Sequence, residues 1–379
     1  MSLCSEADWA NLEKYHRVLG ISGLGEFSRN ELDKALAGKM ASVFMGMSRD
    51  YDYMSGFSTV KDLETMFQLA YLHMTNIRKD EKSFATLMNQ YETILKNKSL
   101  SPEGAFSDSI TVTTANHNWR DKPFEVSDIA NVNYDRILQI AKERTANAAD
   151  FTFYFVGNFD EELIRQYICQ YIASLPAKGK PEKYNNVHEF PMGNVVNQFT
   201  REMETPKAMS YMSWFTTSAP YDMRTRVLAS MAGQLLDKIY LQKIREDNGA
   251  AYSASAFGGA RMYGDQVITQ IIGYVPMTPD KSDLALSIMR EEMANLAISV
   301  DEASLQDIKE VMLKDFDTNV KENSYWMNVI NMWDERGIDL YTGYKDVVNS
   351  ITPADVCAFV QNVILAAGNH TEVTMLPAE

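Results

Sequence analysis

Cysteine is scarce in this chain of 379 residues, which contains only Cys4, Cys169 and Cys357. Because the three cysteines are odd in number and widely separated, neither a disulfide framework nor a Cys-Xaa-Xaa-Cys metal knuckle is expected. The chain also lacks any apolar run of the roughly 20 residues that a helix needs to span a bilayer. Its first residues show no signal-peptide pattern. We therefore expect no membrane-spanning helix.

Blocks of positive charge are absent as well. The chain has 36 lysine and arginine residues against 51 aspartate and glutamate residues, which gives a formal net charge of −15 at pH 7. Nucleic acids and anionic membrane surfaces are recognised by clustered cations. The composition therefore predicts no nucleic-acid partner.

The sequence also lacks a pattern that would hold a metal ion. A hydrolytic zinc site needs histidine and carboxylate ligands at fixed spacing, and the adjacent pair His188-Glu189 has no second histidine nearby. No Gly-Xaa-Ser-Xaa-Gly, phosphate-binding lysine loop or dinucleotide glycine motif is present either. We expect no metal ligands and no catalytic residue in this chain. The five histidines are spread along it: His16, His73, His117, His188 and His370.

The pattern of apolar residues predicts an α+β fold with two similar domains. A chain of this length exceeds the usual size of one core, and residues 177–192 are rich in lysine, glycine, asparagine and proline with little apolar periodicity. We place a linker there, between a domain at 1–180 and a domain at 190–379. In each half, strand-like residues precede several helices and a returning strand, at 151–156 and at 371–376. This order predicts, in each domain, a mainly antiparallel sheet covered by helices.

The most informative stretch is residues 235–274. Its start continues an apolar helical face that includes Leu228, Met231 and Leu235. Gly249 predicts a left-handed residue that ends this helix, and residues 250–257 and 267–275 then predict a hairpin, with glycines 258, 259 and 264 between the strands.

Two donors flank the predicted helix end. Arg245 falls in the last helical turn and Tyr252 early in the first strand, so both hydrogen-bond donors can converge on a carbonyl oxygen. The structural alternative is that an arginine near a helix C-terminus only complements the helix dipole and that a tyrosine in a strand is ordinary.

Residues 244–252, Ile-Arg-Glu-Asp-Asn-Gly-Ala-Ala-Tyr, resemble the fourth domain of the pitrilysin/insulinase-type (M16) zinc peptidases. Residues 153–160, Phe-Tyr-Phe-Val-Gly-Asn-Phe-Asp, together with residues 171–176, Tyr-Ile-Ala-Ser-Leu-Pro, resemble the end of that family's third domain. The resemblance covers nearly the whole chain. It implies the M16 peptidase-like fold, also called LuxS/MPP-like, in both domains.

The resemblance also implies a function. In this family an amino-terminal half carries the zinc motif HxxEH, and a silent carboxy-terminal half encloses the peptide substrate. That half reaches the substrate backbone through an arginine and a tyrosine, which correspond here to Arg245 and Tyr252. Since HxxEH is absent, we expect a carboxy-terminal half that is inactive alone, with zinc on a separate amino-terminal half as its partner.

The alternative implied by the same resemblance is a non-catalytic peptide-binding or assembly subunit. The sequence leaves open whether the chain is part of a working enzyme, which peptide it meets, its oligomeric state, and whether its compartment is the cytoplasm or the periplasm.

Overall fold

The computed structural model describes residues 4–378 except 179, 181 and 184. It contains two compact units. The first unit comprises the described residues up to Leu100 together with Pro123–Val187, and the second comprises Ser101–Lys122 together with the described residues from His188 onward. The sequence assigns residues 101–122 to the first domain, whereas the structure groups them with the second unit.

The second unit is built on a five-stranded sheet with the order β5-β9-β6-β8-β7. Neighbouring strands are antiparallel except for β5 and β9, which are parallel. The sheet is thus mostly antiparallel, with β9 from the end of the chain inserted between β5 and β6. The strands are β5 (Asn194–Arg201), β6 (Ala208–Thr216), β7 (Ser255–Tyr263), β8 (Gln266–Met277) and β9 (Asn369–Pro377).

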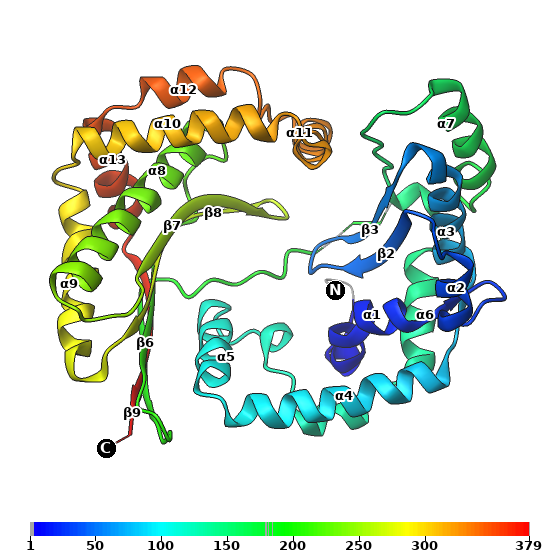
Figure 1. Ribbon diagram of the computed structural model, residues 1–379, viewed down its shortest axis with the longest axis horizontal. Coiled ribbons are helices and arrows are strands. Elements are labelled where there is room, and N and C mark those ends of the chain that lie inside the picture. The colour runs from blue at the N-terminus through cyan, green and yellow to red at the C-terminus, as the bar shows by residue number, and fades with distance from the viewer. Residues whose placement is uncertain (1–3, 179, 181, 184, 379) are drawn as a thin grey trace. The chain divides into compact units, whose positions relative to one another are not determined.

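Helices cover both faces of this sheet. Figure 1 shows α8, α9, α10 and α13 on one side and α5 on the other. The larger core lies under α8, where Met231, Leu236 and Ile271 are fully buried. The helical segments of this unit are α5 (Pro102–Thr114), η3 (Trp119–Asp121), α8 (Met223–Tyr240), η7 (Leu241–Asp247), η8 (Pro279–Lys281), α9 (Ser282–Leu296), α10 (Glu302–Asn319), α11 (Asn323–Arg336), α12 (Tyr344–Ser350), α13 (Pro353–Phe359), η9 (Val360–Ile364) and η10 (Leu365–Ala367).

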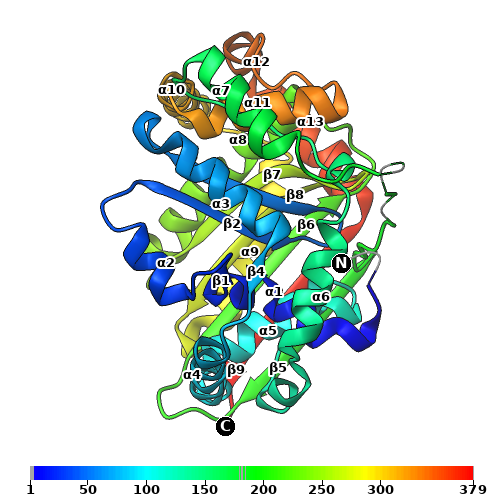
Figure 2. The same ribbon diagram turned by 90° about the vertical axis from the view of Figure 1, so that its right-hand side faces the viewer.

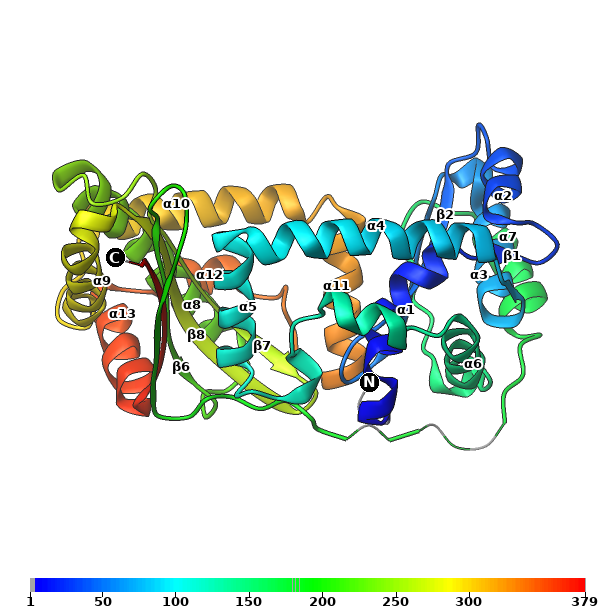
Figure 3. The same ribbon diagram turned by 90° about the horizontal axis from the view of Figure 1, so that it is seen from below.

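The helix α5 explains why residues 101–122 belong to the second unit. Ser101 caps it by accepting a hydrogen bond from the Gly104 backbone N–H. Its Phe106 is buried against Met209, Val373 and Met375 on the sheet face opposite α8, and Figure 3 shows α5 and α9 on opposite sides of β6. Burial of this aromatic side chain removes a large apolar surface from water.

The first unit has only small sheets among its described residues. Its strands form two separate antiparallel pairs, β1 with β4 and β2 with β3. Figure 2 shows α3 alongside β2, and α1 packs its buried Tyr15 and Val18 against Ile137 and Ile140 of α6. The elements are η1 (Glu6–Asp8), α1 (Trp9–Ile21), β1 (Gly23–Leu24), α2 (Arg29–Ala35), β2 (Ala41–Met47), β3 (Asp52–Ser58), η2 (Val60–Asp62), α3 (Leu63–Thr75), β4 (Ile77–Arg78), α4 (Glu81–Leu100), η4 (Val126–Asn131), α6 (Tyr134–Arg144), η5 (Ala148–Asp150), α7 (Glu161–Tyr167) and η6 (Ile168–Ile172).

The strand predicted at residues 151–156 is not formed. The structure assigns no strand to these residues. Their apolar character instead reflects packing on α3, because the ring of Phe155 stacks on that of Phe67 with centroids 5.2 Å apart. Among the described residues, the first unit therefore shows no counterpart of β9, which the sequence predicts.

No single helix in the described part of the chain is long and apolar enough to cross a membrane, although the bent pair Tyr344–Ser350 and Pro353–Ala367 meets the criteria of length and composition.

Candidate functional site

The candidate site lies at the end of the helix formed by α8 and η7. Asp222 caps α8 through a 2.7 Å hydrogen bond from the Thr225 N–H to its carboxylate. After Tyr240 the helix widens into η7, a π-helical stretch of seven residues. Such stretches are rare and frequently mark functional positions. Residues 245–252, which we call the corner, connect this helix to the hairpin.

The helix side of the corner is anchored in the core. Tyr240 and Ile244 have no exposed surface, and the Tyr240 hydroxyl donates a 2.7 Å hydrogen bond to the Met289 carbonyl. Burial raises the pKa of Tyr240 above its ordinary value, so this hydroxyl stays protonated. Gly273 leaves room for the Tyr240 ring, because a Cβ there would lie 2.7 Å from it.

A second anchor is the close approach of α8 to β7. A Cβ on Gly233 would lie 2.0 Å from the Gly258 backbone nitrogen, and a Cβ on Gly258 would lie 1.9 Å from the Ala229 carbonyl oxygen. The sequence interpretation of Gly258 and Gly259 as turn residues is wrong: both lie within β7, and the turn is at Gly264 and Asp265. Two facing glycines instead let helix and strand backbones touch.

The predicted helix stop is present at Gly249, whose φ is +55°. The Gly249 N–H donates to the Arg245 carbonyl at 2.9 Å, and the Ala250 N–H donates to the Ile244 carbonyl at 2.8 Å. The Ala250 carbonyl in turn accepts a 2.8 Å hydrogen bond from the Thr278 N–H. The backbone of the corner is thus fixed to the helix on one side and to the end of β8 on the other.

Lys281 completes this scaffold, and sequence reasoning missed it. Its Nζ donates to the Asn248 carbonyl at 2.7 Å and lies 3.4 Å from the Gly249 carbonyl oxygen. A cation there satisfies carbonyls that a helix end leaves unpaired and complements the helix dipole. The contact joins residues more than 30 positions apart, so no local pattern signals it.

The two predicted donors occupy the exposed side of the corner. Tyr252 is 89% exposed, and its hydroxyl contacts no hydrogen-bonding partner among the residues that the structure describes. Arg245 is half exposed, and its Nε lies 3.4 Å from a carboxylate oxygen of Glu246. Tyr252 lies three residues before β7 begins, so its predicted place within the strand is wrong.

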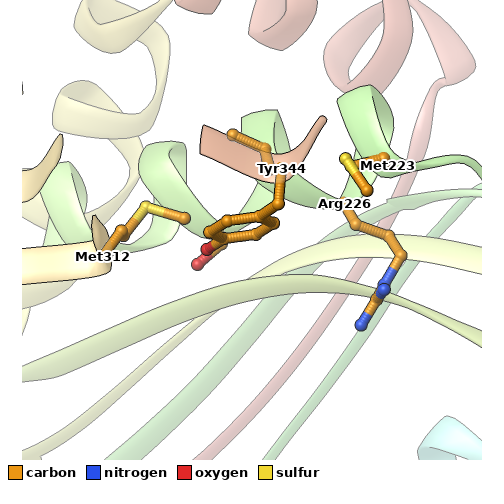
Figure 4. Close-up of a pocket in the computed structure, with 6 residues that line it drawn as sticks. Met223, Arg226, Met312 and Tyr344 are labelled. Carbon is orange, nitrogen blue, oxygen red and sulfur yellow. The ribbon is translucent and has the colours of Figure 1, made fainter. Parts of the chain in front are cut away.

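The described residues contain no group of three or more histidine, cysteine, aspartate or glutamate side chains that could hold a metal ion. They do contain a hollow of about 150 Å³ elsewhere in the second unit. Figure 4 shows Tyr344 of α12 between Met312 of α10 and Met223 of α8 in this hollow. Neither corner donor lines it. The lining residues are Met223, Arg226, Val227, Ser230, Met312 and Tyr344.

Comparison with known proteins finds a family match over part of the chain. The family described as Peptidase M16 inactive domain matches residues 131–312, which include the corner. The probable zinc protease PqqL of Escherichia coli strain K12 is 22% identical over 318 residues, covering 83% of this chain and 34% of PqqL. The chain therefore spans about a third of the length of this curated relative.

Solved structures agree in fold over the whole chain. The periplasmic protease PqqL of Escherichia coli superposes with a TM-score of 0.83 at 20% identity, covering 99% of this chain and 41% of that one. A mutant of the ferredoxin protease FusC, solved in complex with Arabidopsis ferredoxin, gives 0.80 at 15% identity, with coverages of 98% and 40%.

The first half of PqqL, solved alone, also superposes, with a TM-score of 0.68 at 12% identity over 99% of this chain and 84% of that half. This chain thus shares its fold with one half of the PqqL structure. Its fold is the M16 peptidase-like fold that the sequence predicts. Residues 131–312 of this chain match the M16 peptidase inactive domain.

Proposed function

We propose that this chain is the carboxy-terminal half of an M16-type zinc metalloendopeptidase and that it encloses a peptide substrate together with a zinc-bearing half. The match of residues 131–312 to the M16 inactive domain carries this proposal. The length relation supports it, because the superposition covers 99% of this chain but only 41% of the PqqL structure. The remaining part of such an enzyme leaves room for an HxxEH half.

In this proposal Arg245 and Tyr252 hold the substrate backbone. A guanidinium and a phenol are both donors, and a peptide carbonyl accepts from either. Tyr252 is available for such a bond because it is 89% exposed. The hydrogen bonds of Gly249, Ala250 and Lys281 hold the corner backbone, from which both donors extend. Fixed donors aimed at a carbonyl where negative charge develops lower the barrier most.

Zinc belongs, in this proposal, to the partner half. The described residues of this chain offer no group that could hold it, and we assign them no step that uses the metal. Their contribution is to bind and orient the peptide. The chain alone is accordingly expected to leave peptides intact.

The test is reconstitution of the chain with an HxxEH-bearing half of the same family, followed by measurement of kcat/KM on a fluorogenic peptide. Replacing Tyr252→Phe removes one donor and is expected to lower kcat/KM by about 10²–10³-fold, as for other pre-organised carbonyl-binding donors. Arg245→Ala is expected to lower it as well. Tyr341→Phe, which removes the hydroxyl of another partly exposed tyrosine, is the matched control and should leave kcat/KM unchanged.

Three results would overturn parts of this proposal. Full activity of Tyr252→Phe would show that the Tyr252 hydroxyl does not bind the substrate. Peptide cleavage by the chain alone, abolished by a zinc chelator, would contradict the proposal that this half is inactive by itself. Peptide binding without any gain in turnover from an HxxEH half would favour the non-catalytic subunit that the sequence leaves as the alternative.

A further inference from the structure

The hollow formed by α8, α10 and α12 combines apolar walls with polar groups that lack partners. Its volume is about 150 Å³, and an apolar cavity of about that volume holds a benzene molecule. Val227 and Met312 in its wall are buried, while its four other lining residues are partly exposed. The hollow is therefore open to solvent on one side and has room for a compact molecule.

Arg226 of α8 is the charged residue of the hollow. Its guanidinium lies over the Tyr221 ring, 5.4 Å from the centroid, and forms no ion pair or hydrogen bond with the described residues. Arg224, two residues earlier, instead donates to the Asp355 carboxylate at 2.7 Å. Carboxylates are not scarce, since the chain has 51 acidic and 36 basic side chains. The guanidinium donors of Arg226 are therefore available for an anion from outside the chain.

Tyr344 of α12 forms another wall of the hollow. Its ring stacks on that of Phe316 with centroids 4.6 Å apart, and an ion pair of 2.5 Å between Lys345 and Asp317 joins α12 to α10. Burial raises the pKa of Tyr344, and the nearby Arg226 cation lowers it in part. The Tyr344 hydroxyl has no hydrogen-bonding partner among the described residues. Figure 4 shows that it lies apart from the Arg226 guanidinium.

We propose that this hollow binds a small organic carboxylate that has a compact apolar body. The fork of N–H donors on Arg226 matches the two oxygens of a carboxylate. The side chains of Met223, Val227 and Met312 pack against the apolar part, for which methionine is well suited because it adapts its shape. An inorganic anion would leave these apolar walls uncovered, and a hydrocarbon would leave Arg226 unpaired. The site is separate from the corner, so the inference goes beyond the proposed function.

The same ligand chemistry has two sources. One is a free acid with a single ring or a short branched chain, and the other is an apolar residue at the C-terminus of a peptide. Both present a carboxylate next to an apolar group. The formal net charge of −15 repels anions from the surface as a whole. Binding of either ligand therefore depends on the local groups of the hollow.

The first experiment uses benzoate as the probe and the NMR signals of ¹³C-methyl methionine as the readout. The chain has 22 methionines, of which Met223 and Met312 line the hollow. Met223→Leu and Met312→Leu assign their two signals, because leucine has a similar volume. Benzoate is expected to shift these two signals with a Kd on the order of 1 mM. Benzamide has the same shape without the charge, and we expect it to bind at least about tenfold more weakly.

Two arginines of α8 provide a matched pair of variants. Arg226→Gln and Arg224→Gln each remove one positive charge from the same part of the helix, and circular dichroism checks that both are folded. Arg226→Gln is expected to weaken benzoate binding by about tenfold or more, the effect of losing hydrogen bonds to a charged group. Arg224→Gln should bind within about twofold of the unchanged chain, because its guanidinium is paired with Asp355 outside the hollow.

Four results would overturn the inference: no shift up to about 20 mM benzoate, equal binding of benzamide, equal weakening by both glutamine variants, or shifts confined to other methionines. N-acetylphenylalanine then separates the two sources. Tighter binding than benzoate would assign the hollow to peptide C-termini, and weaker binding would assign it to free acids. All these measurements use the chain without a zinc half, so their outcome is independent of the Tyr252 turnover test.

Discussion

The corner has a packed side and an exposed side that differ sharply in their surroundings. On the packed side, Tyr240, Ile244 and Ala250 have no exposed surface. On the exposed side, Tyr252 is 89% exposed and Arg245 has only Glu246 beside it among the described ion-pair partners. The packed residues hold the backbone of the corner. The side chains on the exposed side bury much less surface in the core.

This difference separates stability from binding within one short segment. Functional side chains are most effective when a rigid scaffold positions them and their own polar groups stay available. Changes on the packed side should therefore lower the free energy of unfolding. Changes on the exposed side should leave it intact and alter only the interaction with substrate.

The largest effect is expected where α8 touches β7. Gly233→Val would place a Cβ about 2.0 Å from the Gly258 nitrogen, and because the obstacle is backbone it cannot rotate away. We expect the free energy of unfolding to fall by about 3 kcal/mol or more, measured by urea unfolding with circular dichroism. Gly259→Ala is the control, since nothing lies within 4 Å of its Cβ position. An equal loss in both variants would show that the contact is not the cause.

A smaller effect is expected at the helix stop. Gly249 has φ +55°, a region that costs other residues roughly 1–2 kcal/mol. Gly249→Ala should lower the free energy of unfolding by that amount, measured in the same way. Its Cβ would lie 3.6 Å from the Lys281 Nζ, an ordinary contact, so the cost is conformational. Gly249→Asn should lose less because asparagine tolerates this conformation better. Equal losses would point to another cause.

Local patterns in the sequence predict much of this corner. The apolar spacing identifies the buried face of α8, on which Leu228, Met231 and Leu235 all lie in the core. The left-handed stop at Gly249 is also readable, since glycine favours that conformation at a helix end. These features depend on residues only a few positions apart.

Features that depend on distant residues are not predictable in this way. Residues 151–156 have the composition of a strand but are not a strand in the structure, where Phe155 packs on Phe67. The helix α5 belongs to the second unit because its Phe106 packs against residues of β9. Lys281 reaches the corner through tertiary structure alone. The role of Arg245 and Tyr252 stays a prediction from family resemblance.

Lys281 provides a still smaller effect on the packed side. Lys281→Met keeps most of the stem but removes the charged donor to the Asn248 carbonyl. We expect a loss of about 0.5–1.5 kcal/mol in the free energy of unfolding, measured by thermal and urea unfolding. Lys321→Met is the control, because the Lys321 ammonium forms no ion pair or hydrogen bond with the described residues. A loss no greater than that of the control would mean that the helix end does not need this cation.

The smallest effect on stability is expected on the exposed side, from Tyr252→Phe. Its hydroxyl has no partner among the described residues, and the ring is already in water, so the free energy of unfolding should change by less than about 0.5 kcal/mol.

The same chemical change on the packed side is Tyr240→Phe. There the Met289 carbonyl loses its 2.7 Å donor inside the core, which costs about 1–3 kcal/mol. Urea unfolding of both variants compares the two sides of the corner, because each variant loses only one tyrosine hydroxyl. If Tyr252→Phe destabilised the chain as much as Tyr240→Phe, its hydroxyl would have a structural partner. The loss of turnover proposed for this variant would then need no contact with substrate.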